Sequence, residues 1–137
     1  MGLKKLQRIM GVDPGLKATG YGVIEVECEG GIKALEVGLI EPKAKGLLSE
    51  KLLTIYKHLG DIIDRQTPDV VVLEKIYSHS VHPMTVAVMG HARGVICLVC
   101  AQKGVRIIEE SPKRVRKAIV GNGNASKEQT QRVVANF

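Results

Sequence analysis

Five short stretches in which apolar residues dominate predict β-strands. They cover residues 7–13, 20–28, 32–41, 70–74 and 105–109. Pro14-Gly15 follows the first stretch and Glu29-Gly30-Gly31 the second, and both are turn signals that predict a compact, hairpin-connected start to the chain. The fourth stretch, Val70-Val71-Val72-Leu73-Glu74, is apolar at four consecutive positions. Such a run predicts a central strand that is buried on both faces.

Apolar residues at helical spacing predict helices between and after these strands. From Gly46 to Gln66 the spacing is that of an amphipathic helix. From Thr85 to Lys103 the residues are apolar on nearly every side, which predicts a helix buried in the core or at a subunit contact. Ser111-Pro112 provides an N-cap and a first helical proline for a basic helix. Gly121-Asn122-Gly123-Asn124 ends that helix, and a last helix begins near Ala125.

The order of these elements predicts a single α/β domain over residues 1–137 with a mixed sheet. Its 45% apolar and 25% charged residues are typical of a soluble globular protein. His91 and Arg93 interrupt the longest apolar stretch, so we expect no membrane span. The N-terminus does not resemble a signal peptide, and three cysteines suggest no disulfide framework. We therefore expect a cytoplasmic protein.

Positive charge is concentrated in the last quarter of the chain. The net charge is +6, and residues 103–137 contain eight lysines and arginines against three glutamates. On a helix, Lys113, Arg116 and Lys117 share one face at a spacing that suits successive phosphates, and Lys127 continues this basic segment. The asymmetry favours a polyanionic partner such as nucleic acid. The alternative is a charged face that contacts only water.

Two carboxylates stand at the ends of apolar strands. Asp13 ends the first strand before Pro14-Gly15, and Glu74 ends the fourth. If these strands are neighbours, both side chains meet at one edge of the sheet, where they suit Mg²⁺ or Mn²⁺ and phosphodiester hydrolysis. The alternative is that each acid caps a helix or lies in solvent. Tyr77, three residues after Glu74, either stacks on an unpaired base or packs on the long helix.

Two further spacings do not predict zinc sites. His79 and His82 lie in an expected loop without a nearby cysteine or acid to complete a metal site. Cys97 and Cys100 lie inside an apolar helix, where buried thiols are ordinary core residues.

The motifs resemble those of the RuvC family of bacterial crossover-junction endodeoxyribonucleases. The resemblance begins with Gly11-Val12-Asp13-Pro14-Gly15 and Thr19-Gly20-Tyr21-Gly22-Val23-Ile24. It continues through Leu73-Glu74, Gly90-His91-Ala92-Arg93-Gly94-Val95 and the segment from Val115 to Lys127. These segments occur in the family's order over nearly the whole chain.

The resemblance implies a ribonuclease-H-like fold, with a mixed five-stranded sheet flanked by helices, and a homodimer that resolves Holliday junctions by paired, Mg²⁺-dependent nicks in recombination and repair. By position, Asp13 and Glu74 match catalytic, metal-binding acids. Tyr77 matches a junction-stacking aromatic, and Arg116 and Lys127 match DNA-contacting cations. Gly90 and Gly94 lie on the counterpart of the dimer-forming helix. The family also works with a branch-migration helicase complex.

Two departures from the family pattern affect the expected activity. Glu110 stands where the family commonly has an aromatic residue. Family members also continue beyond the position of Phe137 into a helix whose acids complete the metal cluster, so the sequence reads as truncated at its C-terminus. The alternative function is therefore a junction-binding module without competent nuclease activity. A third hypothesis, a sugar or acetate kinase with a related phosphate loop, needs a second domain for which 137 residues leave no room.

Overall fold

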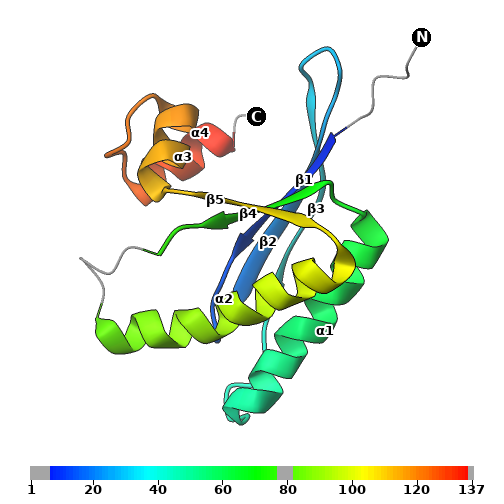
Figure 1. The fold of residues 1–137 in the computed structure, drawn as a ribbon. Coiled ribbons are helices and arrows are strands. Elements are labelled where there is room, and N and C mark those ends of the chain that lie inside the picture. The colour runs from blue at the N-terminus through cyan, green and yellow to red at the C-terminus, as the bar shows by residue number, and fades with distance from the viewer. Residues whose placement is uncertain (1–6, 77–81, 136–137) are drawn as a thin grey trace.

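The chain folds into one five-stranded sheet with helices packed against it (Figure 1). The computed structural model describes residues 7–76 and 82–135. Its elements, in chain order, are β1 (Gln7–Asp13), β2 (Thr19–Val26), β3 (Ile32–Ile40), α1 (Leu48–Gln66), β4 (Val70–Glu74), α2 (Pro83–Lys103), β5 (Arg106–Glu110), α3 (Pro112–Val120) and α4 (Lys127–Val134). Every strand and helix expected from the apolar pattern is present, with ends shifted by no more than two residues.

The strands lie in the order β3-β2-β1-β4-β5. β1, β2 and β3 form an antiparallel meander, whereas β4 runs parallel to β1 and β5 runs parallel to β4. The sheet is therefore mixed, as predicted. Because β1 and β4 are parallel neighbours, their carboxyl ends meet at one edge of the sheet.

The core lies between one face of the sheet and helices α1 and α2. Met10, Val23 and Leu73 point from the strands into this layer and are fully buried. Ile55 and Leu59 of α1 and Ile96 of α2 pack into the same cluster. Helices α3 and α4 lie at the end of the sheet where β5 ends, away from α1 (Figure 1). At the end of the sheet next to α3 and α4, the sheet face opposite α1 and α2 thus remains available for a site.

Helix α2 is buried on one side only. Its buried residues are Ala92, Ile96, Val99 and Cys100, which lie between the middle of the helix and its C-terminal end. Met84, Val88 and Leu98 are large apolar side chains that remain exposed. Within the single chain, burial therefore holds for only one stripe of this helix, which α1 and the sheet cover, and burial of the remainder at a subunit contact stays a prediction.

His91 and Arg93 were expected to exclude a membrane span, but a test of length and composition alone does not exclude one. Among the described residues, α2 is long and apolar enough, by length and composition only, to cross a bilayer, and the mean hydropathy of its most apolar 18 residues is 1.7. In the fold, however, Ala92 and Ile96 pack into the core, and Arg93 binds the ends of β4 and β5. Helix α2 is a structural part of this domain.

Candidate active site

The bend after β1 places Asp13 at the rim of the sheet. Thr19, which is completely buried, donates a 2.8 Å hydrogen bond through Oγ1 to the carbonyl of Gly15. The amide of Gly15 donates a 3.3 Å hydrogen bond to Oγ1 of Thr19 in return. A Cβ atom at residue 15 would lie 2.4 Å from the carbonyl oxygen of Ala18, so only glycine fits this close approach. The backbone that follows Asp13 is consequently fixed at both ends of the bend.

Asp13 and Glu74 stand side by side on neighbouring strands. The parallel ladder pairs Val12 with Leu73, and the two acids are the next residues of β1 and β4. Val12 and Leu73 point into the core, so the alternation of side chains along a strand directs both carboxylates to the opposite face. The sequence-based prediction that these acids meet at one sheet edge is correct in its geometry.

The electrostatics of Glu74 reflect this proximity. Its pKa is raised first by shielding of the carboxyl from water and next by the negative charge of Asp13. The positive charge of Arg116 acts in the opposite direction. The Glu74 carboxyl is therefore repelled by the carboxylate of Asp13 on β1 and attracted by the guanidinium of Arg116 on α3.

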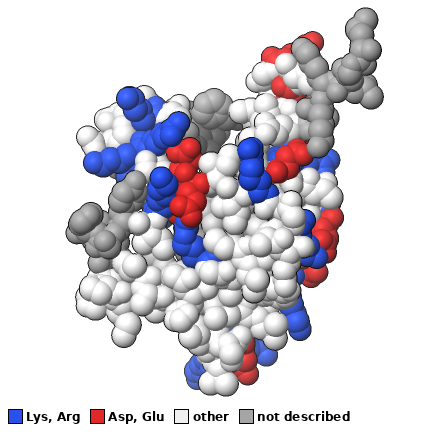
Figure 2. Space-filling model, viewed as in Figure 1, with Lys and Arg blue, Asp and Glu red and all other residues white. Residues whose placement is uncertain are grey.

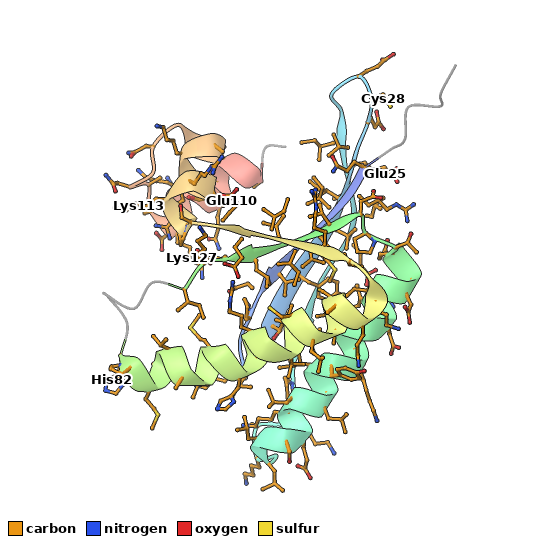
Figure 3. All side chains as sticks on the ribbon, in the orientation of Figure 1. Glu25, Cys28, His82, Glu110, Lys113 and Lys127 are labelled. Atoms are coloured by element: carbon orange, nitrogen blue, oxygen red, sulfur yellow. The ribbon has the colours of Figure 1, made fainter. Side chains whose placement is uncertain are left out.

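The two acids line a cleft of about 570 Å³. Its floor is formed by residues of β1, β2 and β4, and one wall by α3 and α4. It is lined by Gly11, Val12, Asp13, Gly20, Tyr21, Gly22, Val72, Leu73, Glu74, Glu110, Pro112, Val115, Arg116, Lys127 and Thr130. Lysine and arginine side chains gather over α3 and α4 next to acidic ones (Figure 2). Glu110 and Lys127 lie at this same end of the sheet (Figure 3).

Capped helices position the cations of the wall. The Ser111 hydroxyl accepts a 3.1 Å hydrogen bond from the amide of Arg114 at the start of α3. Gly121 ends α3 in the left-handed conformation, with a φ of 81°. Ser126 and Gln129 form a reciprocal capping box at the start of α4. These caps fix the helix that carries Arg116 and the first residue of α4, which is Lys127.

The structure brings together four of the predicted site residues: Asp13, Glu74, Arg116 and Lys127 all line the cleft. Lys113 and Lys117 are exposed on α3 but do not line it. Tyr77 lies outside the described residues, as does His79.

Glu110 is a cleft residue that the site prediction did not include. It is the register partner of Glu74 on β5, and its carboxylate lies 3.5 Å from Nε of Arg114. Its position directly after the predicted strand 105–109 and before Ser111-Pro112 is the sequence signal that could have identified it. That signal required knowing that β5 pairs with β4.

Two of the residues rejected as zinc ligands, His82 and Cys100, have structural roles. His82 caps α2, since its Nδ1 accepts a 3.2 Å hydrogen bond from the amide of Met84. Burial raises the pKa of Cys100 to about 11, which keeps its thiol protonated and unsuited to bind a metal. Among the described residues, no group of three or more histidine, cysteine or acidic side chains is arranged to hold a metal ion.

Gly90 and Gly94 are exposed on α2. Apart from its chain neighbours and the backbone of its own helix, a Cβ atom at either position would have no protein atom within 4 Å in the described part of the chain. The predicted notch is therefore open along this side of the helix.

The donor set at the sheet edge fits a hard divalent cation. Burial and, next, the charge of Asp13 raise the pKa of Glu74, and both effects are offset when a cation lies between the two carboxylates. Oxygen ligands with open positions for water and phosphate are typical of Mg²⁺ and Mn²⁺ sites. Asp13 and Glu74 are the described residues that would hold such an ion, and Arg116 and Lys127 lie where phosphates would approach.

Paired strand-end carboxylates beside cations, on a mixed sheet covered by helices, are an arrangement typical of metal-dependent enzymes that act on phosphodiesters. Residues 9–137 match the family model described as crossover junction endodeoxyribonuclease RuvC. The chain belongs to the RuvC family.

Individual members of the family agree with this assignment. The crossover junction endodeoxyribonuclease RuvC of Rhodopirellula baltica is 42% identical over 126 residues, which cover 92% of this chain and 70% of that protein. The structure of Thermus thermophilus RuvC superposes with a TM-score of 0.85 at 25% identity and covers 95% of this chain and 79% of the other. A T. thermophilus RuvC structure in complex with a Holliday junction substrate has the same TM-score at 23% identity, covering 95% and 78%. The predicted ribonuclease-H-like fold is confirmed.

Proposed function

We propose that this protein is a structure-specific endonuclease that resolves Holliday junctions by hydrolysing DNA phosphodiesters. The observation that carries the proposal is the adjacent pair of Asp13 and Glu74 in a cleft whose wall presents Arg116 and Lys127. Family membership supports the substrate, since relatives are named as crossover junction endodeoxyribonucleases. A divalent metal requirement follows from the same membership, and we propose Mg²⁺, with Mn²⁺ as a substitute.

Each residue of the cleft has a distinct part in this function. Asp13 and Glu74 hold the divalent cation, which when bound activates water and stabilises the leaving oxygen. Arg116, whose charge already acts on Glu74, binds the phosphate next to the site. Lys127 binds a neighbouring phosphate from the first turn of α4, where the helix dipole also favours an anion. Lys113 and Lys117 give weaker, longer-range attraction to DNA from the outer side of α3.

We also propose that two copies act together. A four-way junction has two equivalent strands to cut, and a two-fold symmetric dimer presents one site to each. The exposed apolar residues of α2, Met84, Val88 and Leu98, together with the notch at Gly90 and Gly94, supply a surface for the second copy. Tyr77 is proposed to stack on an unpaired base, a branch-migration helicase complex to be a further partner, and the cytoplasm to be the location.

The test of the proposal is the cleavage of a synthetic four-way junction. Asp13→Asn and Glu74→Gln keep the shape of each side chain but remove a charged ligand, so both should abolish Mg²⁺-dependent cutting and leave junction binding intact. Asp64→Asn on α1, at an exposed acid that pairs with Lys103, is the matched control and should cut like the wild type. Replacing Mg²⁺ by Mn²⁺ in the same assay identifies the metal preference.

The other outcomes are equally informative. A wild-type protein that binds junctions but does not cut them with either metal would favour the junction-binding module. Loss of binding in Asp13→Asn would make Asp13 a structural residue. A linear duplex that competes equally with the junction would contradict structure-specific recognition.

A further inference from the structure

Arg93 of α2 is bound to the strand end that carries Glu74. Its Nη1 donates a 2.7 Å hydrogen bond to the main-chain carbonyl of Glu74. Its Nη2 donates to Oε1 of Glu109 on β5 and forms an ion pair with it. The Arg93 side chain is only 15% exposed. One guanidinium thus joins α2 to the last residue of β4 and to the second-last residue of β5.

The end of β4 needs such support more than its middle does. Glu74 is the final residue of β4, and the chain leaves the sheet directly after it. On the side of β5, the amide of Lys75 donates a 2.8 Å hydrogen bond to the carbonyl of Glu110. Strand ends open more readily than strand centres, because fewer hydrogen bonds must break. The bond from Arg93 adds an anchor at the carbonyl of the residue whose side chain faces the cleft.

Arg93 itself does not line the cleft. Met10, Val12 and Leu73 form the core layer on its side of the sheet, whereas the carboxylates of Asp13 and Glu74 project from the other side. Arg93 therefore reaches only the main chain beneath the site. A planar fork that bonds two acceptors at once defines an orientation that a lysine ammonium does not.

We propose that Arg93 is a positioning residue, which holds the backbone of Glu74 so that its carboxylate stays beside that of Asp13 and the pair can share one divalent cation. This inference rests on the metal site of the proposed function. Sites of this kind depend on ligands held to within about 0.5 Å. The chain supplies that rigidity from α2 and β5, not from the cleft.

The experiment compares variants of the full chain by two readouts that need no DNA. Mn²⁺ binding is measured by electron paramagnetic resonance, and exchange of the Lys75 amide hydrogen by NMR. Arg93→Met replaces arginine by a side chain with a similar unbranched apolar stem and removes the guanidinium donors. It should weaken Mn²⁺ binding and speed Lys75 exchange, each by about tenfold, the equivalent of one lost hydrogen bond. Arg93→Lys retains one donor group, so both its Mn²⁺ affinity and its Lys75 exchange rate should lie between those of the wild type and of Arg93→Met.

Two further variants separate positioning from charge and from general stability. Glu109→Gln keeps an acceptor for Arg93 and removes only the ion pair, so its Mn²⁺ affinity should stay within about twofold of the wild type. Lys103→Met removes another ion pair of α2, with Asp64, at the far end of the helix. It should leave both readouts unchanged.

The results distinguish this inference from the proposed function. Wild-type Mn²⁺ affinity and Lys75 exchange in Arg93→Met would overturn the role of Arg93 while leaving the nuclease intact. An equal loss in Lys103→Met would show that α2 packing in general, not Arg93, supports the site, and would also overturn it. If the wild type neither binds Mn²⁺ nor cuts junctions, the proposed function fails and this inference with it. If Arg93→Met does not fold, the Mn²⁺ affinity of Arg93→Lys tests the role of Arg93 instead. A weakened affinity supports that role, and a wild-type affinity overturns it.

Discussion

The phenol of Tyr21 on β2 lies directly over Gly38 on β3. A Cβ atom at Gly38 would be 2.6 Å from the Tyr21 hydroxyl oxygen, closer than two such atoms can approach. The two residues are register partners in the antiparallel ladder, so the ring crosses its neighbour instead of packing beside it. Gly38→Ala should therefore displace Tyr21 and lower the free energy of unfolding by about 1–3 kcal/mol, measured by urea denaturation.

Gly22 offers the matched control in the same pair of strands. The nearest atom to a Cβ at Gly22 lies 3.9 Å away, an ordinary contact. Gly22→Ala should leave stability unchanged or raise it slightly, because alanine is less flexible in the unfolded chain. Equal effects of the two substitutions would show that backbone flexibility, not the Tyr21 ring, explains the glycine at position 38.

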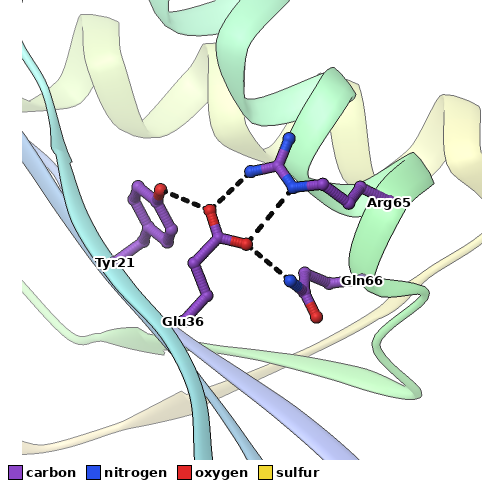
Figure 4. Close-up of polar contacts among 4 residues, drawn as sticks. All are labelled: Tyr21, Glu36, Arg65 and Gln66. Atoms are coloured by element: carbon purple, nitrogen blue, oxygen red, sulfur yellow. Dashed lines mark hydrogen bonds and ion pairs between the residues drawn. The ribbon is translucent and has the colours of Figure 1, made fainter.

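A second prediction concerns the carboxylate of Glu36, which accepts a hydrogen bond from the Tyr21 hydroxyl (Figure 4). Hydrogen bonds from Arg65 and then from Tyr21 lower its pKa from 4.5 to about 2. A carboxyl whose pKa is lower in the folded state stabilises the fold fully above pH 4.5 and loses that contribution as the pH falls towards 2. The contribution is roughly 1 kcal/mol, because Arg65 is half exposed and water screens the pair.

Glu36→Gln removes this contribution at neutral pH. The free energies of unfolding of the variant and the wild type, measured in urea at several pH values, should differ at pH 7 and converge between pH 4.5 and 2. Curves that stay parallel over this range would contradict the role given to the Glu36 charge.

Most of the fold could be predicted from the sequence because its signals are local. Ser111-Pro112 marks the start of α3, and Gly121 ends that helix in the left-handed conformation that glycine adopts without strain. The environment of α2 was harder to predict. Apolar periodicity cannot show whether Leu98 meets this chain or a second copy, since both surroundings exclude water in the same way.

In the candidate site, too, the residues with local sequence signals could be predicted, and those that depend on contacts between distant segments could not. Asp13 and Glu74 were recognisable as strand-end acids, and the parallel pairing of β1 with β4 then brought them together. Glu110 and Arg93 act through pairings between distant parts of the chain, which no local spacing encodes. Lys113 and Lys117 show the limit of a helical-face argument. Lys113 lies three residues before Arg116 and Lys117 directly after it, so all three share one helical face, yet only Arg116 lines the cleft.

A third prediction tests the proposed dimer through the notch of α2. Gly90→Leu and Gly94→Leu together would place two bulky side chains where a second helix is expected to approach. Since a Cβ at either position meets no atom of another part of the described chain within 4 Å, the monomer itself should remain folded. Sedimentation equilibrium should show that the double variant dissociates at protein concentrations at which the wild type is a dimer.

Ala101→Leu adds similar bulk at an exposed position near the end of the same helix and should leave the dimer intact. Unchanged association of the double glycine variant would place the contact on another surface. Monomeric wild-type protein would contradict the dimer itself.

The last prediction concerns the cations of the cleft wall. Each phosphate contact releases counterions, so removal of one contact should reduce the slope of log binding constant against log salt concentration by about 1. Arg116→Ala and Lys127→Ala should therefore each weaken junction binding and flatten its salt dependence, measured by fluorescence anisotropy with a labelled four-way junction. Lys117→Ala is the control from the outer side of α3, and its slope should change less. If Lys117→Ala flattens the slope as much as Arg116→Ala does, the DNA follows the exposed face of α3 and not the cleft beside Asp13 and Glu74.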